Sequence, residues 1–167
     1  RYGGDFALLY LDFDRFKEIN DTFGHDGGDI LIISAAKRIQ SVIRSCDQLS
    51  RFGGDEFALL QTQIASVQHC ELLAERIIEA MRKPFEIHDQ KINIGVSIGI
   101  ALCRNGDSDR DELMRLADLA LYRAKHQGRG HFVFFDEAMN TELQRQKRTE
   151  EELRNAITHD ELEVFYQ

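Results

Sequence analysis

The stretch Arg51-Phe52-Gly53-Gly54-Asp55-Glu56-Phe57 places two adjacent glycines directly before two adjacent carboxylates. Apolar residues lie on both sides of it, so the sequence predicts a β-hairpin over about 49–60 with the carboxylates at its turn. Glycines at this spacing let the backbone turn tightly and let a ligand approach it closely. Two like charges this close raise each other's pKa unless a cation neutralises them. The turn is therefore suited to a divalent metal and a phosphate-bearing ligand.

Apolar patterning on both sides of the hairpin predicts strands and helices in alternation. Short apolar runs predict strands over 6–11, 85–87, 92–101 and 132–135. Apolar residues at helical spacing predict helices over 28–43, 64–81 and 113–124. We therefore expect an α/β fold with a mixed central sheet flanked by helices.

The two ends of the chain suggest a piece of a larger protein. The chain opens at Arg1 on a strand-like run without a start methionine. Charged residues dominate 136–160, where opposite charges at helical spacing predict a solvated connecting helix. A strand pattern follows over 162–167. The expected organisation is a domain over 1–136, a connecting helix over 137–160 and the first strand of a truncated domain over 161–167.

Composition limits what the chain binds and where it resides. The 167 residues include 29 acidic and 21 basic ones, and the net charge of -8 argues against binding along a nucleic-acid backbone. No apolar run approaches the roughly 20 residues that a membrane-spanning helix needs, so we expect no direct membrane contact. The three cysteines form no Cys-x-x-Cys pair, and reduced thiols in a cytoplasmic protein account for them most simply.

The segment from Asp12 to Asp29 carries residues suited to phosphate chemistry. Asp12 stands at the end of a predicted strand, and a helix start with Lys17 follows, which makes a workable metal and phosphate site. Asp14 is well placed to cap that helix rather than to act as a ligand. His25 is expected to be structural, because no partner at metal-binding spacing accompanies it.

Two other pairs of residues leave alternatives open. Lys125 and Arg129 stand four residues apart at the end of a predicted helix. They either contact phosphates or complement the helix dipole. Arg44 and Asp47 lie just upstream of the hairpin, where they form either a ligand site or a plain surface ion pair.

Taken in order, these motifs resemble the GGDEF family of diguanylate cyclases over nearly all of residues 5–136. The matching motifs are those over 12–29, 53–57, 97–101 and 117–125. The tail over 152–167 resembles the entry into an EAL phosphodiesterase domain. Gly130 departs from the family pattern, because asparagine is common at that position.

The resemblance implies a fold like that of nucleotide-cyclase and polymerase palm domains, a ferredoxin-like core with an added β-hairpin. It also implies a metal-dependent reaction in which two GTP molecules condense into cyclic di-GMP and release pyrophosphate. Each of two protomers would hold one GTP, so a homodimer would form the active site. The product would also bind at an inhibitory Arg-x-x-Asp site.

Residue roles follow from the same resemblance, position by position. The implied ligands of Mg²⁺ or Mn²⁺ are Asp12, the Phe13 carbonyl, Asp55 and Glu56. The implied catalytic residues are Asp55, Glu56 and Lys125. The implied substrate-binding residues are Phe16, Lys17, Asn20, Asp29, Gly53, Gly54 and Arg129, with Asn20 and Asp29 on the guanine edge. The implied inhibitory product site consists of Arg44 and Asp47.

A second function fits the same sequence. The domain would then be a non-catalytic module that binds GTP or cyclic di-GMP and controls an attached EAL phosphodiesterase. The sequence favours the cyclase, because each matched catalytic position carries a competent residue.

Overall fold

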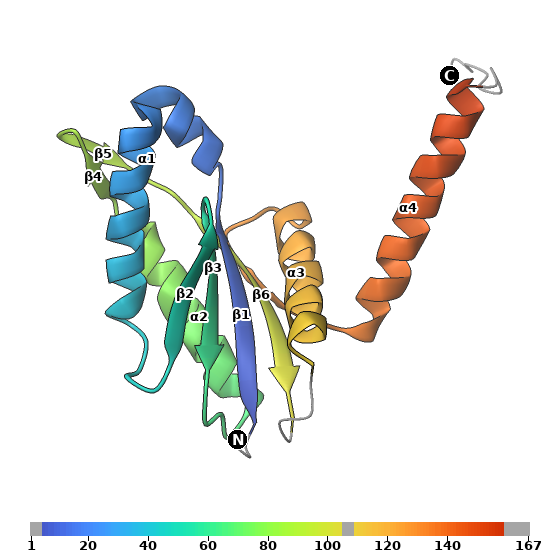
Figure 1. Cartoon of the computed structure of the whole chain (residues 1–167), viewed down its shortest axis with the longest axis horizontal. Helices are drawn as coiled ribbons and strands as arrows, with labels where there is room; N and C mark the ends of the chain where they lie inside the picture. The colour runs from blue at the N-terminus through green and yellow to red at the C-terminus, as the bar shows by residue number, and fades with distance from the viewer. Residues whose placement is uncertain (1–4, 105–108, 159–167) are drawn as a thin grey trace. The chain divides into compact units, whose positions relative to one another are not determined.

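The structure, a computed structural model, describes residues 5–104 and 109–158 (Figure 1). The chain divides into two compact units, Arg1–Phe135 and Asp136–Gln167. The strands of the first unit are β1 (Phe6–Phe13), β2 (Gln48–Gly53), β3 (Glu56–Gln61), β4 (Phe85–Ile87), β5 (Gln90–Ile92), β6 (Val96–Cys103) and β7 (Phe132–Phe134). Its helices are α1 (Phe16–Gln40), α2 (Val67–Arg82) and α3 (Arg110–His126). Among the described residues, five strands form a sheet in the order β2-β3-β1-β6-β7, and β4 pairs with β5.

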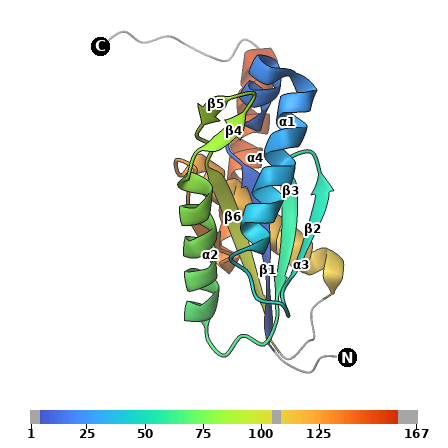
Figure 2. The ribbon, with the colours of Figure 1, turned by 90° about the vertical axis from the view of Figure 1, so that its left-hand side faces the viewer.

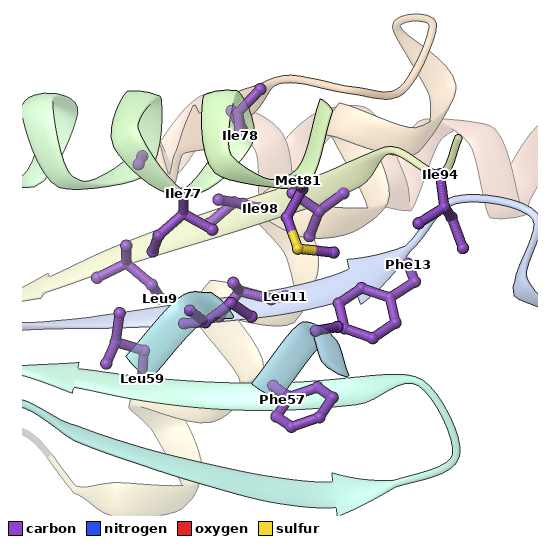
Figure 3. Close-up of a cluster of buried hydrophobic side chains, with 14 of the residues drawn as sticks. Leu9, Leu11, Phe13, Phe57, Leu59, Ile77, Ile78, Met81, Ile94 and Ile98 are labelled. Carbon is purple, nitrogen blue, oxygen red and sulfur yellow. The ribbon is translucent and has the colours of Figure 1, made fainter. Parts of the chain in front are cut away.

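The central strand β1 separates two hydrophobic cores. Leu9 and Leu11 lie in the larger core with residues of α1 and α2 (Figure 3). Leu8 and Tyr10, which point to the other face, pack with residues of α3. Figure 2 shows α1 and α2 on one side of the sheet and α3 on the other. Because β1 is covered on both faces, its run of apolar residues is continuous rather than alternating.

The sheet is mixed, as the apolar patterning predicted. β1 pairs antiparallel with both β3 and β6, whereas β6 pairs parallel with β7. Close packing of α3 on β6 depends on Gly99, because a Cβ at this position would lie 2.0 Å from the Ala117 carbonyl oxygen. This close approach brings the last turn of α3, with Lys125, over the sheet.

Two predicted elements have different bounds in the structure. The sequence indicated a helix start near Lys17 and an apolar helix from residue 28, but both belong to one helix, α1, which begins at Phe16 and continues across a kink at Gly24 (φ 72°, ψ 175°). A residue with a Cβ is strained at these angles, so the glycine that looked like an interruption allows the helix to bend. The single strand expected over 92–101 is also wrong. It divides into the end of β5 and most of β6, in separate sheets.

The second unit contains α4 (Glu137–Thr158). A charged helix was expected over 137–160, and α4 occupies most of that range. Within it, Arg148 forms an ion pair with Glu152, one turn later, at 2.8 Å. The strand expected over 162–167 lies outside the described residues, and so does the proposed start of an EAL domain. Within 5–104 and 109–158, no helix is long and apolar enough to cross a membrane.

Candidate functional site

The turn between β2 and β3 is the predicted hairpin turn, and it is open. Gly54 has a positive φ of 51°, and its carbonyl oxygen accepts a hydrogen bond of 3.0 Å from Arg51 Nε. The pairing shifts register between Arg51 and Gly53, which makes Phe52 the extra residue of a β-bulge. A Cβ at either glycine would meet no described atom within 4 Å. The turn therefore leaves room for a ligand close to its backbone.

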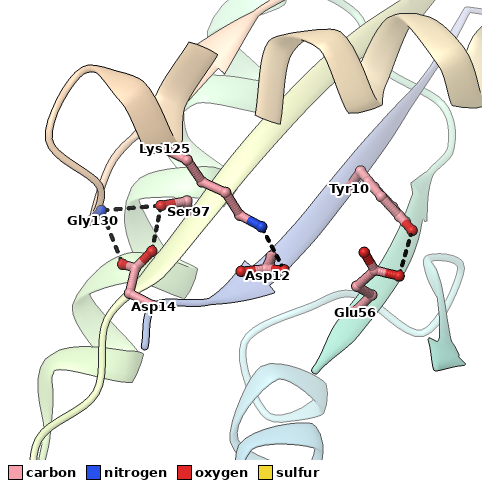
Figure 4. A network of polar contacts seen from close by, with 7 residues as sticks. All are labelled: Tyr10, Asp12, Asp14, Glu56, Ser97, Lys125 and Gly130. Carbon is pink, nitrogen blue, oxygen red and sulfur yellow. Dashed lines mark hydrogen bonds and ion pairs between the residues drawn. The ribbon is translucent and has the colours of Figure 1, made fainter. Parts of the chain in front are cut away.

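Asp12 and Glu56 are direct cross-strand neighbours in the β1–β3 pairing. Two like charges at such positions destabilise a sheet unless something neutralises them. Lys125 does so from α3, because its Nζ lies 2.6 Å from Asp12 Oδ2 (Figure 4). Asp12 is buried, with 8% of its surface exposed, so its carboxylate is largely shielded from solvent.

The carboxylates around Lys125 carry more negative charge than one ammonium group balances. Burial raises the pKa of Asp12, Lys125 opposes this, and the charges of Asp55 and Glu56 raise it further. Burial likewise raises the pKa of Asp55, with Glu56 adding to the effect and Lys125 opposing it. The pKa of Asp118 on α3 is raised by partial burial and by Glu56. Such a site favours an additional cation.

The side chains as they stand do not form a complete metal cage. Among the described residues, no group of three or more His, Cys, Asp or Glu side chains is arranged to hold a metal ion. Mg²⁺, however, needs only one or two carboxylates when substrate phosphates complete its shell. Asp12 and Asp55 carry oxygen atoms of the type that such a cation prefers, so the donor set fits a divalent cation that arrives with a nucleotide.

Sequence reasoning missed Tyr10 at this site. Its hydroxyl donates a hydrogen bond of 3.1 Å to Glu56 Oε2 (Figure 4). Burial, and then the charge of Glu56, raise the pKa of Tyr10 well above its usual value, so the hydroxyl stays protonated. A signal was present in the sequence. Tyr10 lies two residues before Asp12 on a strand, and residues at that spacing share a face.

The residues expected to read guanine both lie on α1, on either side of its kink at Gly24. A Cβ at Gly28 would lie 2.0 Å from Asn20 Oδ1 and 3.1 Å from the Phe16 ring. Asn20 and Phe16 therefore lie against Gly28, immediately before the exposed Asp29 in the chain. Lys17 is exposed at the start of the same helix.

Asp14 does not cap α1, contrary to the sequence prediction. The residue at the N-cap position is Arg15. The Asp14 carboxylate accepts hydrogen bonds from Ser97 Oγ at 2.6 Å and from the Gly130 amide at 3.0 Å. Gly130 has φ 68°, a conformation that asparagine also tolerates, which agrees with the family's usual residue there. The Asp14 carboxylate therefore binds two groups distant in sequence instead of capping the N-terminus of α1.

Arg129 precedes Gly130 in the loop that Asp14 holds. It is exposed, with φ 63°, and lines a cleft of about 390 Å³ together with Arg15 and Glu18. Lys125 instead points toward Asp12. The two cations predicted as a pair therefore have different surroundings.

The Arg44–Asp47 segment is built around a buried carboxylate. Asp47 is 7% exposed and accepts hydrogen bonds from the backbone amides of Arg44 at 3.0 Å and Thr62 at 3.3 Å. A cavity of about 60 Å³ lies beside it, and the residues that line it include Arg44, Asp47 and two polar α2 residues that were not expected there, His69 and Arg76. The cluster is rich in hydrogen-bond donors.

Comparison with known sequences shows which family the chain resembles. The model of the family described as "Diguanylate cyclase, GGDEF domain" matches residues 1–131. MucR of Pseudomonas aeruginosa, a bifunctional diguanylate cyclase/cyclic di-GMP phosphodiesterase, is 40% identical over 162 residues, or 97% of this chain. The match spans 24% of MucR, so the chain corresponds to about a quarter of that relative.

Solved structures agree with the sequence comparison. The GGDEF domain of TpbB (YfiN) from Pseudomonas aeruginosa gives a TM-score of 0.80 at 36% identity, covering 84% of this chain and 83% of that one. The GGDEF domain of DgcB from Caulobacter crescentus, in complex with cyclic di-GMP, gives 0.72 at 32% identity, covering 79% and 78%. These likenesses confirm the fold class that the sequence predicted.

Proposed function

The chain belongs to the GGDEF diguanylate cyclase family, and from this premise we propose that it condenses two GTP molecules into cyclic di-GMP with release of pyrophosphate. The observation that carries the proposal is the Lys125–Asp12 ion pair of 2.6 Å beside Asp55 and Glu56. Carboxylates that can hold a cation and an ammonium group that can meet a phosphate thus lie on one face of the sheet.

The reaction is the attack of a ribose 3′-hydroxyl on an α-phosphate, with pyrophosphate as the leaving group. Asp12 and Asp55 would hold Mg²⁺ or Mn²⁺, with the Phe13 carbonyl and Glu56 assisting. The bound cation would neutralise phosphate charge and favour deprotonation of the attacking hydroxyl. Lys125 would move from Asp12 to the phosphates once Asp12 is engaged elsewhere.

Base and phosphate contacts would come from α1 and from the end of α3. Asp29 would accept hydrogen bonds from the N1 and N2 hydrogens of guanine, and Asn20 offers both a donor and an acceptor. The backbone at Phe16, together with the side chains of Lys17 and Arg129, would contact the phosphates. The open turn at Gly53 and Gly54 would let the nucleotide approach the backbone.

Catalysis would require two copies of the chain, because each copy holds one GTP and the new bonds join the two nucleotides. Product inhibition is proposed at Arg44 and Asp47, with Arg76 as a third contact from α2. The complex of DgcB with cyclic di-GMP supports product binding in this family. GTP as substrate implies a cytoplasmic location.

A regulatory role is the second candidate. MucR joins cyclase and phosphodiesterase in one protein, and this chain corresponds to 24% of it. In such a protein the domain could bind GTP or cyclic di-GMP without turnover and control an attached EAL phosphodiesterase.

One experiment separates the two candidates. Purified protein is incubated with GTP and Mg²⁺ or Mn²⁺ over a range of protein concentrations, and cyclic di-GMP is quantified by chromatography with mass detection. The cyclase should form product with a rate per molecule that rises with protein concentration, and Asp55→Ala should form none. Measurable GTP binding without product at any concentration would leave the regulatory module as the function.

A further inference from the structure

Tyr10 contacts the Gly-Gly-Asp-Glu turn on both sides. After the turn, its hydroxyl donates to Glu56 Oε2 at 3.1 Å. Before the turn, the ring of Phe52 meets the Tyr10 ring edge to face, with centroids 6.0 Å apart and planes at 90°. A single side chain of the central strand thus contacts both strands of the hairpin beside the turn.

The register of the sheet explains this contact. Asp12 lies opposite Glu56, and Tyr10 lies opposite Ala58, so all four side chains share the face of the sheet that α3 covers. Tyr10 and Glu56 are therefore diagonal neighbours, a separation that a long aromatic side chain can span. Their hydrogen bond directs the Glu56 carboxylate along the sheet toward Tyr10 (Figure 4).

The bulge at Phe52 makes the second contact possible. Because the β2–β3 register shifts between Arg51 and Gly53, Phe52 is the extra residue in its strand. Bulges redirect side chains next to functional sites. Phe52 is half exposed, and its ring contacts the buried ring of Tyr10.

We propose that Tyr10 is a positioning residue for the metal–nucleotide site: its hydroxyl orients Glu56, and its ring fixes the hairpin turn through Phe52. The inference rests on the proposed function. Carboxylates that approach a metal are commonly oriented by such hydrogen bonds, whose loss lowers metal affinity about 10- to 100-fold. Only Glu56 Oε2 accepts this bond, which leaves Oε1 for the ligand side.

The test measures binding rather than turnover. Mn²⁺ is titrated into protein saturated with a GTP analogue that carries a methylene bridge between the α- and β-phosphates, and free Mn²⁺ is read by electron paramagnetic resonance. Tyr10→Phe keeps the ring and its contact with Phe52 but removes the hydroxyl. We expect it to bind Mn²⁺ about 10-fold more weakly than the parent protein while its melting temperature without metal stays nearly the same.

Two further variants test the route of the effect. Tyr122→Phe is the matched control, because Tyr122 is half exposed on α3 and stacks on His126. It should leave Mn²⁺ binding unchanged. In a Glu56→Ala background, Tyr10→Phe should weaken binding by less than about twofold, because residues that act through each other give non-additive effects.

The outcomes separate this inference from the proposed function. Parent-like Mn²⁺ binding by Tyr10→Phe, with Asp55→Ala binding weakened, would overturn the role of Tyr10 and leave the cyclase proposal standing. An equal loss from Tyr10→Phe in the parent and Glu56→Ala backgrounds would also overturn it. The predicted binding losses in a protein that forms no cyclic di-GMP would support Tyr10 and refute the cyclase. A parent protein that binds no Mn²⁺ would overturn both.

Discussion

Lys125 Nζ lies 2.6 Å from Asp12 Oδ2 and joins the last turn of α3 to the end of β1. Asp12 lies opposite Glu56, the first residue of β3 after the open hairpin turn. Lys125 gives the buried Asp12 carboxylate an ion-pair partner. The same contact links the stability of the fold to the chemistry of the site. A ligand that binds Asp12 or Lys125 would break the ion pair, and so would change both the stability of the fold and the charge of the site.

Removing the Lys125 ammonium should weaken the fold. Lys125→Ala leaves the buried Asp12 carboxylate beside Asp55 and Glu56 without its ion-pair partner. In urea with EDTA, we expect the free energy of unfolding to fall by about 1–2 kcal/mol. This is less than the loss for a deeply buried ion pair, because the Lys125 side chain is 31% exposed. Lys37→Ala, an exposed lysine of α1, is the control. Asp12→Asn should rescue part of the loss, and an unchanged urea midpoint in Lys125→Ala would contradict the prediction.

Asp55→Asn should stabilise the metal-free protein at neutral pH. Folding raises the pKa of Asp55, mainly through burial, so ionisation of this carboxyl costs stability. The cost is absent below the unfolded pKa of about 3.9 and fully present above the folded pKa. In EDTA at pH 7, the melting temperature of the variant should exceed that of the parent by a few degrees. Near pH 3.5, the two melting temperatures should be the same. A gap of equal size at both pH values would argue against this cause.

Gly28→Ala should impair GTP binding through Asn20. The added Cβ would lie 2.0 Å from Asn20 Oδ1, so this side chain must move. Loss of its hydrogen bonds to the base should raise KM for GTP roughly tenfold, equivalent to about 1.4 kcal/mol, with a much smaller change in kcat. Ser34→Ala on the same helix is the control. An unchanged KM would exclude Asn20 from base recognition.

Ser97→Ala tests the role of Asp14. Because Asp14 accepts hydrogen bonds from Ser97 and Gly130, deleting the fully buried Ser97 hydroxyl should destabilise the protein by about 1–2 kcal/mol. The Gly130 amide should also exchange its hydrogen faster, because the hydroxyl accepts from it at 3.2 Å. Unchanged stability and exchange would be expected if Asp14 were only a helix cap.

Arg76→Ala should relieve product inhibition. Arg76 lines the cavity beside Asp47, and its guanidinium group donates to the Val42 carbonyl oxygen. We expect cyclic di-GMP to inhibit the variant about 10-fold less strongly, as for one charged contact with a phosphate. The initial rate without product should stay the same. Arg82→Ala, on the same helix but paired with Glu79, is the control, and equal inhibition of Arg76→Ala and the parent would refute the contact.

Several features of the fold could be predicted because they depend on local patterns. The continuous apolar residues of β1 predicted a buried strand, and the glycines before Asp55 predicted the hairpin. The first half of α1 was harder to recognise, because the kink at Gly24 interrupts its pattern. Likewise, the run over 92–101 resembles one strand, and its division between β5 and β6 depends on which sheet each part joins.

The sequence by itself determined the residue types of the site: carboxylates at a glycine turn, a carboxylate at a strand end and cations at a helix end. Only the tertiary structure decided their partners. Cross-strand register set Glu56 beside Asp12 and within reach of Tyr10, and packing of α3 at Gly99 brought Lys125 to Asp12. It also directed Asp14 to Ser97 and Gly130 rather than to the helix that follows it. Spacing along the chain cannot predict these choices, because a hydrogen bond or ion pair is decided by which groups the packed elements bring within about 3 Å.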